Sequence, residues 1–194
     1  MKRLPEAYGS LCRYIETARK EKRPVLLAID GKSGSGKSTL ARRLAESYQA
    51  QLFHMDDFFL QPSQRTPKRL AEVGGNVDYE RFRGEVLEPL AEGREFSYGI
   101  FSCREQRITE QRQARRAQLS IVEGSYSEHP YFGSPYDLTI CLDISMEEQR
   151  ERIRRRSGEE MLKRFTEEWI PKENAYLHKF RIMERCDICI RTDG

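Results

Sequence analysis

The chain has 194 residues, which is enough for one domain and few for two. Its 34 Lys and Arg residues nearly balance 31 Asp and Glu residues, and the net charge of +3 is too small for a protein held on nucleic acid by charge alone. No stretch approaches the roughly 18 apolar residues of a membrane span, and residues 1–6 lack the apolar core of a signal peptide. Five cysteines without framework spacing indicate a reducing compartment. We therefore expect a single cytoplasmic domain with no membrane or nucleic-acid partner.

Strands and helices alternate along most of the chain. Apolar residues at helical spacing predict an N-terminal helix over 4–22, within a segment 1–23 that ends before Pro24. Short apolar runs predict strands at 25–29, 51–55, 119–122, 137–143 and 187–190. Helices are expected at about 37–49, at 79–91, at 147–156, and at 159–183 with a break at Pro171. This alternation predicts an α/β fold with a mainly parallel sheet.

Residues 60–116 interrupt the alternation. Residues 60–78 contain two prolines and two adjacent glycines without periodicity, which predicts a loop. Residues 94–116 are mixed and favour a β-hairpin that ends in a basic turn or helix. We interpret 60–116 as an inserted subregion of the same domain, because strands of the sheet precede and follow it.

The segment Gly31-Lys32-Ser33-Gly34-Ser35-Gly36-Lys37-Ser38 fits the phosphate-loop (P-loop) pattern G-x-x-x-x-G-K-[ST] without a mismatch. Glycines let successive N–H groups turn inward around phosphate oxygens, and the following helix adds its positive N-terminal end. We expect Lys37 to reach the β- and γ-phosphates and Ser38 to bind Mg²⁺. The predicted contacts to ATP, with GTP not excluded, are Gly31, Ser33, Gly34, Ser35, Gly36, Lys37, Ser38 and Thr39.

Three further motifs follow the P-loop in order: His54-Met55-Asp56-Asp57-Phe58-Phe59, then Ile121-Val122-Glu123-Gly124, then five arginines within 150–156. With the P-loop they span roughly residues 25–190, and this series resembles the uridine kinase / phosphoribulokinase family of P-loop kinases. Bacterial uridine kinase-like proteins are the most similar. The resemblance implies a single P-loop kinase domain over 1–194 with three α/β/α layers. It also implies a five-stranded parallel sheet of order 2-3-1-4-5 and an Arg-rich lid at about 150–162.

The resemblance also assigns catalytic residues. The first Asp of the family's Asp-x-Phe-Tyr motif is the general base, which corresponds to Asp56, and the end of a parallel strand is where such a group points into a ligand crevice. Glu123 is implied to hold Mg²⁺ with Ser38, and Arg152 and Arg155 to close the lid, with Arg156 as an alternative. Structural roles stay open: Asp56 as a strand end or helix cap, and the arginines as a solvated helix face.

The acceptor site is expected within and around residues 60–116. The family binds ribose hydroxyls with an Asp near Asp78, although an Asp just before a helix is also a favoured N-cap. Tyr98 matches an aromatic contact to a pyrimidine, whereas Cys103 stands where a base-contacting His is expected. Arg104 would bind an acidic acceptor or lie on the surface. The candidate acceptor-binding residues are Asp56, Phe59, Asp78, Tyr98, Arg104 and Tyr126.

The sequence thus predicts a Mg²⁺-dependent kinase that moves a phosphoryl group from ATP to a hydroxyl of a small molecule, first of all the 5′-OH of uridine or cytidine. Nicotinamide riboside, pantothenate and glycerate are alternative acceptors that would use the same machinery. A nucleotide-dependent switch is a further alternative, but it needs neither Asp56 nor the Arg-rich lid. A nucleic-acid-dependent ATPase is disfavoured by the near-neutral charge. Family members form dimers or tetramers, so a homo-oligomer is also an expectation.

Overall fold

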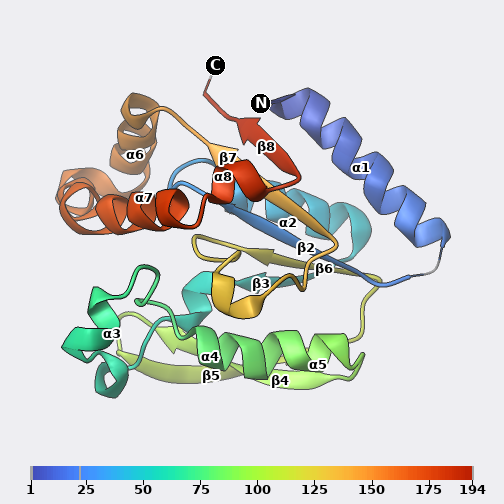
Figure 1. Ribbon diagram of the computed structural model, residues 1–194, viewed down its shortest axis with the longest axis horizontal. Helices are drawn as coiled ribbons and strands as arrows, with labels where there is room; N and C mark the ends of the chain where they lie inside the picture. The colour runs from blue at the N-terminus through green and yellow to red at the C-terminus, as the bar shows by residue number, and fades with distance from the viewer. Residues whose placement is uncertain (1, 22, 194) are drawn as a thin grey trace.

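The computed structural model describes residues 2–21 and 23–193, which form a parallel sheet between helical layers (Figure 1). The sheet has the order β1-β8-β7-β2-β6-β3, with every neighbouring pair parallel. The strands are β1 Lys2–Arg3, β2 Val25–Gly31, β3 Gln51–His54, β6 Leu119–Glu123, β7 Leu138–Asp143 and β8 Ile188–Arg191. When the five longer strands are numbered 1 to 5 in chain order, from β2 to β8, their order in the sheet is the predicted 2-3-1-4-5. The two-residue β1, which lies where only a helix was expected, adds a sixth strand beside β8.

One face of the sheet is covered by α1 Leu4–Lys20 and α2 Lys37–Tyr48. The α1 residues Leu11 and Ile15 are fully buried against β2 and β7 side chains such as Ile29 and Ile140. Burial of each such side chain contributes roughly 1.5–3 kcal/mol to stability. The predicted N-terminal helix is therefore confirmed, and its apolar stripe packs into the core on this face of the sheet.

The other face carries α6 Met146–Arg164, α7 Ile170–Lys179 and α8 Ile182–Arg185, which completes three α/β/α layers. The break predicted at Pro171 is wrong. The chain runs through a π-helix, η5 Phe165–Trp169, straight into α7, and Pro171 lies in the first turn of α7. The gap expected between the helices 147–156 and 159–183 is present at Gly158, with φ 83° and ψ 171°, and a further break comes at Arg181. None of the helices in 2–21 and 23–193 is long and apolar enough to cross a membrane.

Residues 60–116 form a layer beside β3 (Figure 1). Its elements are η2 Pro62–Gln64, α3 Pro67–Ala71, α4 Tyr79–Phe82, η3 Arg83–Leu87, α5 Glu88–Ala91, β4 Phe96–Ser102 and β5 Arg107–Ala114. The expected hairpin is confirmed as the antiparallel pair β4–β5. Its expected basic end is neither turn nor helix, because residues 115–117 connect to β6 without regular structure. Phe53 of β3 packs on Phe96 and Tyr98 of the hairpin, with ring centroids 6.0 and 5.3 Å apart. These contacts join the hairpin to the edge of the sheet.

Candidate active site

The P-loop connects β2 to α2, and its glycines adopt backbone angles that other residues rarely tolerate. Gly31 has φ 125°, and a Cβ built on it would lie 2.1 Å from the carbonyl oxygen of Leu142 on β7. Gly36, with φ 96°, precedes α2 and makes no side-chain cap. The first N–H groups of a helix have no partner within the helix, so the start of α2 can bind an anion.

Lys37 lies inside the loop, and its residue is only 8% exposed. Its Nζ donates to the carbonyl oxygens of Gly31 and Lys32 at 2.7 and 2.9 Å. The ammonium group of Lys37 therefore lies against the backbone at the start of the P-loop. Ser38 and Thr39 are exposed in the first turn of α2, while Ser35 is buried.

Ser38 and Glu123 form the candidate Mg²⁺ site. The Ser38 hydroxyl donates to Glu123 Oε2 at 3.1 Å, and Glu123 is only 5% exposed. The other carboxylate oxygen lies 2.5 Å from His54 Nδ1, and this hydrogen bond raises the pKa of His54. The pairing follows from the sheet, because His54 and Glu123 are register partners at the ends of β3 and β6. A hydroxyl and a carboxylate are the hard oxygen ligands that Mg²⁺ prefers. The part of the chain that the structure describes holds no group of three His, Cys, Asp or Glu side chains suited to a metal, so ATP and water would complete the shell.

Asp56 lies in the one-turn helix η1 Met55–Phe58 that follows β3, and it is open to solvent. Partial desolvation by the surrounding chain and the negative charge of Glu123 raise the pKa of Asp56, against the opposing charges of Lys37, His54 and Arg156. The charges of Lys37 and Glu123 both act on Asp56, so these three side chains lie near one another beyond the ends of the strands. A raised pKa makes the carboxylate a better proton acceptor than an ordinary aspartate.

The neighbouring Asp57 faces the hairpin. Its Oδ2 lies 4.0 Å from the Arg112 guanidinium on β5, and its carbonyl oxygen accepts a hydrogen bond from Arg81 at 2.7 Å. Burial raises the pKa of Asp57 as well. Of the two adjacent aspartates, only Asp56 is exposed.

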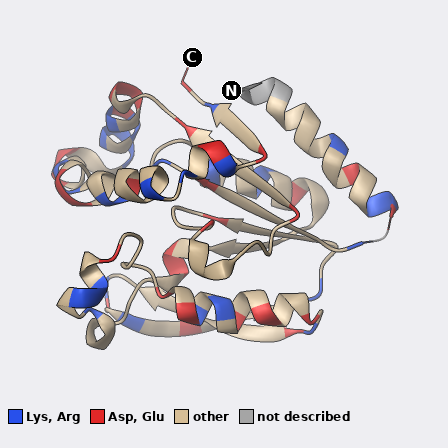
Figure 2. Cartoon of the chain, in the orientation of Figure 1, with Lys and Arg blue, Asp and Glu red and all other residues tan. Residues whose placement is uncertain are grey.

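The Arg-rich helix α6 mixes basic and acidic residues along its length (Figure 2). Arg152 reaches the P-loop: its Nη1 donates to Gly34 O at 3.4 Å and its Nη2 to Thr192 O at 2.8 Å. Arg154 pairs with acidic neighbours on the outer surface. Arg155 is exposed, and no polar partner reaches it within the described chain. Arg156 instead lies close enough to lower the pKa of Asp56. The structure thus brings Arg152 to the P-loop and Arg156 near Asp56, and the role predicted for Arg155 stays a prediction.

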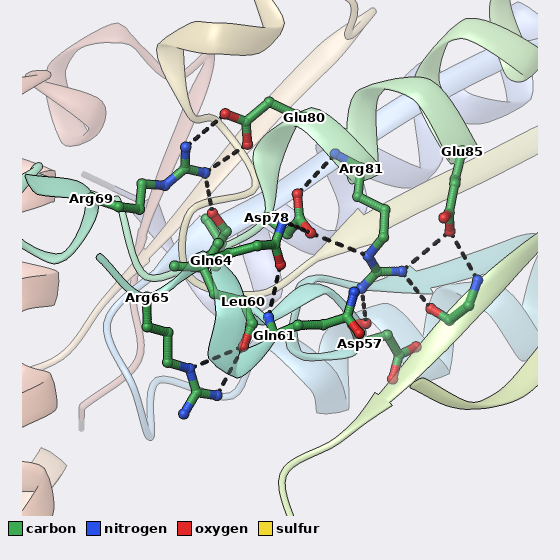
Figure 3. Close-up of polar contacts among 12 residues, drawn as sticks. Asp57, Leu60, Gln61, Gln64, Arg65, Arg69, Asp78, Glu80, Arg81 and Glu85 are labelled. Atoms are coloured by element: carbon green, nitrogen blue, oxygen red, sulfur yellow. Dashed lines mark hydrogen bonds and ion pairs between the residues drawn. The ribbon is translucent and has the colours of Figure 1, made fainter. Parts of the chain in front are cut away.

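Asp78 is held in a network of polar contacts between α3, α4 and the hairpin (Figure 3). It is 2% exposed and caps α4, because its Oδ1 accepts the N–H of Arg81 at 3.1 Å. Its Oδ2 accepts from Gln64 Nε2 at 2.8 Å and lies 3.6 Å from Arg81 Nε. Both carboxylate oxygens are engaged, so the structure displays the capping role. The ribose contact stays a prediction.

The other predicted acceptor residues are spread apart. Tyr98 is fully buried and stacks on Phe58 at 5.9 Å, so the structure places it in the core and not on a surface that an acceptor could touch. Arg104 is exposed in the β4–β5 turn, and Phe59 is half-buried and bridges to Val77. Tyr126 is 6% exposed, and burial raises its pKa, to which the charge of Asp56 adds a smaller part. Only Asp56 of the set is both exposed and beside the P-loop lysine.

The hairpin tip also faces Asp56. Burial, and then the nearby charge of Asp56, raise the pKa of the Cys103 thiol, while Arg65 and Arg164 oppose the shift. Arg65 lies above the Phe101 ring, 5.9 Å from its centroid, and donates to Leu60 O at 2.8 Å. These two arginines were missed by sequence reasoning, because one lies in an irregular loop and the other beyond the expected lid.

Comparison with known proteins identifies the family. The family model of shikimate kinase matches residues 33–194. The chain belongs to the shikimate kinase family. This kinase therefore has a P-loop domain of the type that transfers a phosphoryl group from ATP, with Mg²⁺, to a small molecule. The resemblance to uridine kinases rests on the quoted motifs, and the matching family model does not extend it to uridine.

Solved structures share the fold of this kinase. A "possible uridine kinase" from Bacillus stearothermophilus has 17% identity and a TM-score of 0.66, covering 93% of this chain and 99% of that one. A candidate fructose transport system kinase from Silicibacter sp. has 20% identity and a TM-score of 0.72, covering 93% and 97%. YFH7 from Saccharomyces cerevisiae, a candidate P-loop kinase with a circular permutation, has 13% identity and a TM-score of 0.72, covering 96% and 99%. No curated protein sequence matches the chain.

Two buried carboxylates behind the P-loop of this kinase have no role in the sequence-based prediction. Asp30 is fully buried and accepts hydrogen bonds from Gly31 N at 2.6 Å, Tyr176 Oη at 2.7 Å and Glu128 N at 3.0 Å. Its signal in the sequence is a charge inside an apolar strand, directly before the motif. The second is Glu173 of α7, which contacts Ser33 and has no local signal because the two residues are far apart in the chain.

Proposed function

We propose that this kinase transfers the γ-phosphoryl group of ATP to a hydroxyl, with Asp56 as the general base. The observation that carries the proposal is the position of Asp56, exposed just after the end of β3 and within reach of the charges of Lys37 and Glu123. Phosphoryl transfer needs an acceptor oxygen in line with the γ-phosphate and a group that takes its proton. Asp56 is the exposed carboxylate near Lys37, so we assign it the role of taking the proton from the acceptor hydroxyl.

The remaining roles follow from the same geometry. Lys37 Nζ, which now holds two loop carbonyls, would turn to the β- and γ-phosphates. Arg152 and Arg156 would spread the charge that develops on the transferring group, a task suited to guanidinium forks. Ser38 and Glu123 would hold Mg²⁺, which neutralises phosphate charge when bound. We propose residues 60–116 as the acceptor-binding side of a single domain.

We propose a nucleoside, uridine or cytidine, as the first candidate acceptor, phosphorylated at its 5′-OH. The support is the Asp56-Asp57-Phe58-Phe59 motif and the order of the motifs along the chain. The name of the Bacillus structure agrees with this choice. The burial of Tyr98 removes one expected contact to a pyrimidine, so the hairpin tip at Cys103 and Arg104 would have to recognise the base.

A second candidate is a carboxylated acceptor such as shikimate. The family model favours it. The charges of Arg65 and Arg164 act on Cys103 at the hairpin tip facing Asp56, where an acidic group of the acceptor could bind. This candidate keeps the same donor site and the same base.

The experiment is ADP release from Mg·ATP with a panel of acceptors, followed by mass spectrometry of the product. The panel contains uridine, cytidine, shikimate, fructose, nicotinamide riboside, pantothenate and glycerate. ADP that depends on uridine or cytidine supports the first candidate, and ADP that depends on another acceptor replaces it. ATP binding with no acceptor-dependent ADP would contradict the kinase proposal and favour a nucleotide-dependent switch.

A further inference from the structure

Glu173 places a buried carboxylate directly against the P-loop. It is 3% exposed and comes from α7, which follows the lid segment in the chain. Its Oε2 accepts the backbone N–H of Ser33 at 2.8 Å, and its Oε1 accepts the Ser33 hydroxyl at 2.7 Å. The Ser125 hydroxyl, beyond the end of β6, donates to the same Oε1 at 2.5 Å. One side chain thus joins α7, the P-loop and the segment after Glu123.

Two residues of α6 reinforce this contact. Gln149 Nε2 donates to the carbonyl oxygen of Ser33 at 2.9 Å, and Arg152 donates to that of Gly34 at 3.4 Å. Gln149 is 2% exposed. The N–H, the hydroxyl and the carbonyl of Ser33 are therefore all engaged by side chains of α6 and α7.

The other half of the P-loop is left available. Gly36 precedes α2 without a side-chain cap, and Ser38 and Thr39 are exposed. A phosphate group would bind there, at the helix N-terminus, and not at Ser33. A carboxylate near a triphosphate is electrostatically unfavourable, so a residue that only filled space at this position would be expected to be neutral.

We propose that Glu173 is a positioning residue for the donor site. It holds the Ser33–Gly34 half of the loop against α6 and α7. The phosphate-binding half then keeps its shape and its position relative to Arg152. The inference rests on the proposed binding of ATP by this loop. The opposite role, a carboxylate that competes with phosphate for the loop, predicts the opposite effect of neutralising it.

The test compares Glu173→Ala with Glu173→Gln. Alanine removes the acceptor for the N–H and hydroxyl of Ser33 and leaves the Ser125 hydroxyl only the more distant Gly31 O, at 3.4 Å. We expect the Kd for ATP to rise about tenfold or more, the scale of lost charge-assisted hydrogen bonds. Glutamine keeps an acceptor for the Ser33 N–H and can donate to the two hydroxyls, so we expect rescue to within about threefold of wild type. Adenosine binding should be unchanged in both variants. Glu168→Gln, at an exposed position that pairs with Lys172, is the matched control.

Tighter ATP binding by Glu173→Gln would overturn the proposal in favour of competition, and unchanged ATP binding by Glu173→Ala would overturn it outright. Equal weakening of adenosine and ATP would indicate a general structural role and also contradict it. If Glu173→Ala does not fold, Ser33→Ala and Ser125→Ala each remove one donor to Glu173, and each should raise the Kd for ATP by about threefold. Failure of the wild-type chain to bind ATP would instead contradict the proposed function.

Discussion

Arg81 Nη2 donates to the carbonyl oxygen of Asp57 at 2.7 Å, and this bond ties the turn that carries Asp56 to helix α4 (Figure 3). The same guanidinium donates to Gly99 O of β4 at 2.8 Å and to Glu85 at 3.2 Å. It also lies over the Phe58 ring, 4.2 Å from the centroid. The position of the proposed base is therefore fixed by a side chain from the inserted subregion.

We predict that Arg81→Lys slows turnover more than it weakens ATP binding. A lysine cannot reach Asp57, Gly99 and Glu85 together, and the loss of hydrogen bonds from a charged group costs about 1.5–3 kcal/mol of unfolding free energy. Turnover should fall about tenfold because Asp56 is displaced, while the Kd for ATP stays near that of wild type. Arg83→Lys, at a surface pair with Glu88 at 3.2 Å, is the control. Equal turnover of the two variants would argue against a positioning role for Arg81.

His54 should matter for Mg²⁺ although it is not a proposed ligand. It lies 2.5 Å from Glu123 and orients that carboxylate. Removing the partner of a metal-binding carboxylate typically costs about 10–100-fold in metal affinity or activity. We expect His54→Ala to raise the Mg²⁺ concentration for half-maximal activity by at least about tenfold. The exposed His178→Ala should leave it unchanged, and a wild-type Mg²⁺ requirement in His54→Ala would remove His54 from the metal site.

Asp78 should act through stability. Asp78→Ala removes the α4 cap and the Gln64 bond, and an N-cap alone is worth about 0.5–2 kcal/mol of unfolding free energy. Asp78→Asn keeps a good cap and should recover most of the loss. Chemical denaturation measures both variants, and steady-state kinetics measure the KM for the acceptor. A large rise of that KM in the folded Asn variant would show that Asp78 binds the acceptor as well.

Glu128 should make the fold less stable as the pH rises. Burial and the neighbouring Asp30 raise its pKa from 4.5 to about 9, and its Oε1 is buried without a partner in the described chain. The folded chain then keeps a proton that the unfolded chain releases, so stability falls with pH between about 5 and 9.

Glu128→Gln is neutral throughout that range and keeps the backbone bond from residue 128 to Asp30. We expect the Tm of the variant at pH 8 to exceed that of wild type by at least about 2–4 °C, the shift for 1 kcal/mol in a domain of this size. The difference should shrink toward pH 5. Parallel Tm curves across that range would contradict the prediction, and Glu105→Gln on the hairpin turn is the surface control.

The sequence predicts the features that local patterns encode. The apolar runs, the P-loop and Asp56 at a strand end are each visible as a pattern of a few consecutive residues, and the structure has the strands, the loop and the strand end where they were expected. Glu173 escapes such an analysis, because it meets Ser33 across 140 residues of chain. Tyr98 was misplaced because an aromatic on a hairpin can face either the core or the surface, and packing against Phe53 and Phe58 decides. The continuous helix at Pro171 depends on a π-turn that has no clear pattern in sequence.

The most direct measurement of the central claim compares wild type with Asp56→Asn in acceptor-dependent ADP release, together with the Kd for ATP by calorimetry. We predict an unchanged Kd and a turnover lower by about 10²–10⁴-fold, the typical contribution of a general base. Asp57→Asn, which alters the neighbouring carboxylate that faces Arg112, should keep most of its turnover. An Asp56→Asn variant that turns over at the wild-type rate would contradict the assignment of Asp56 as the base.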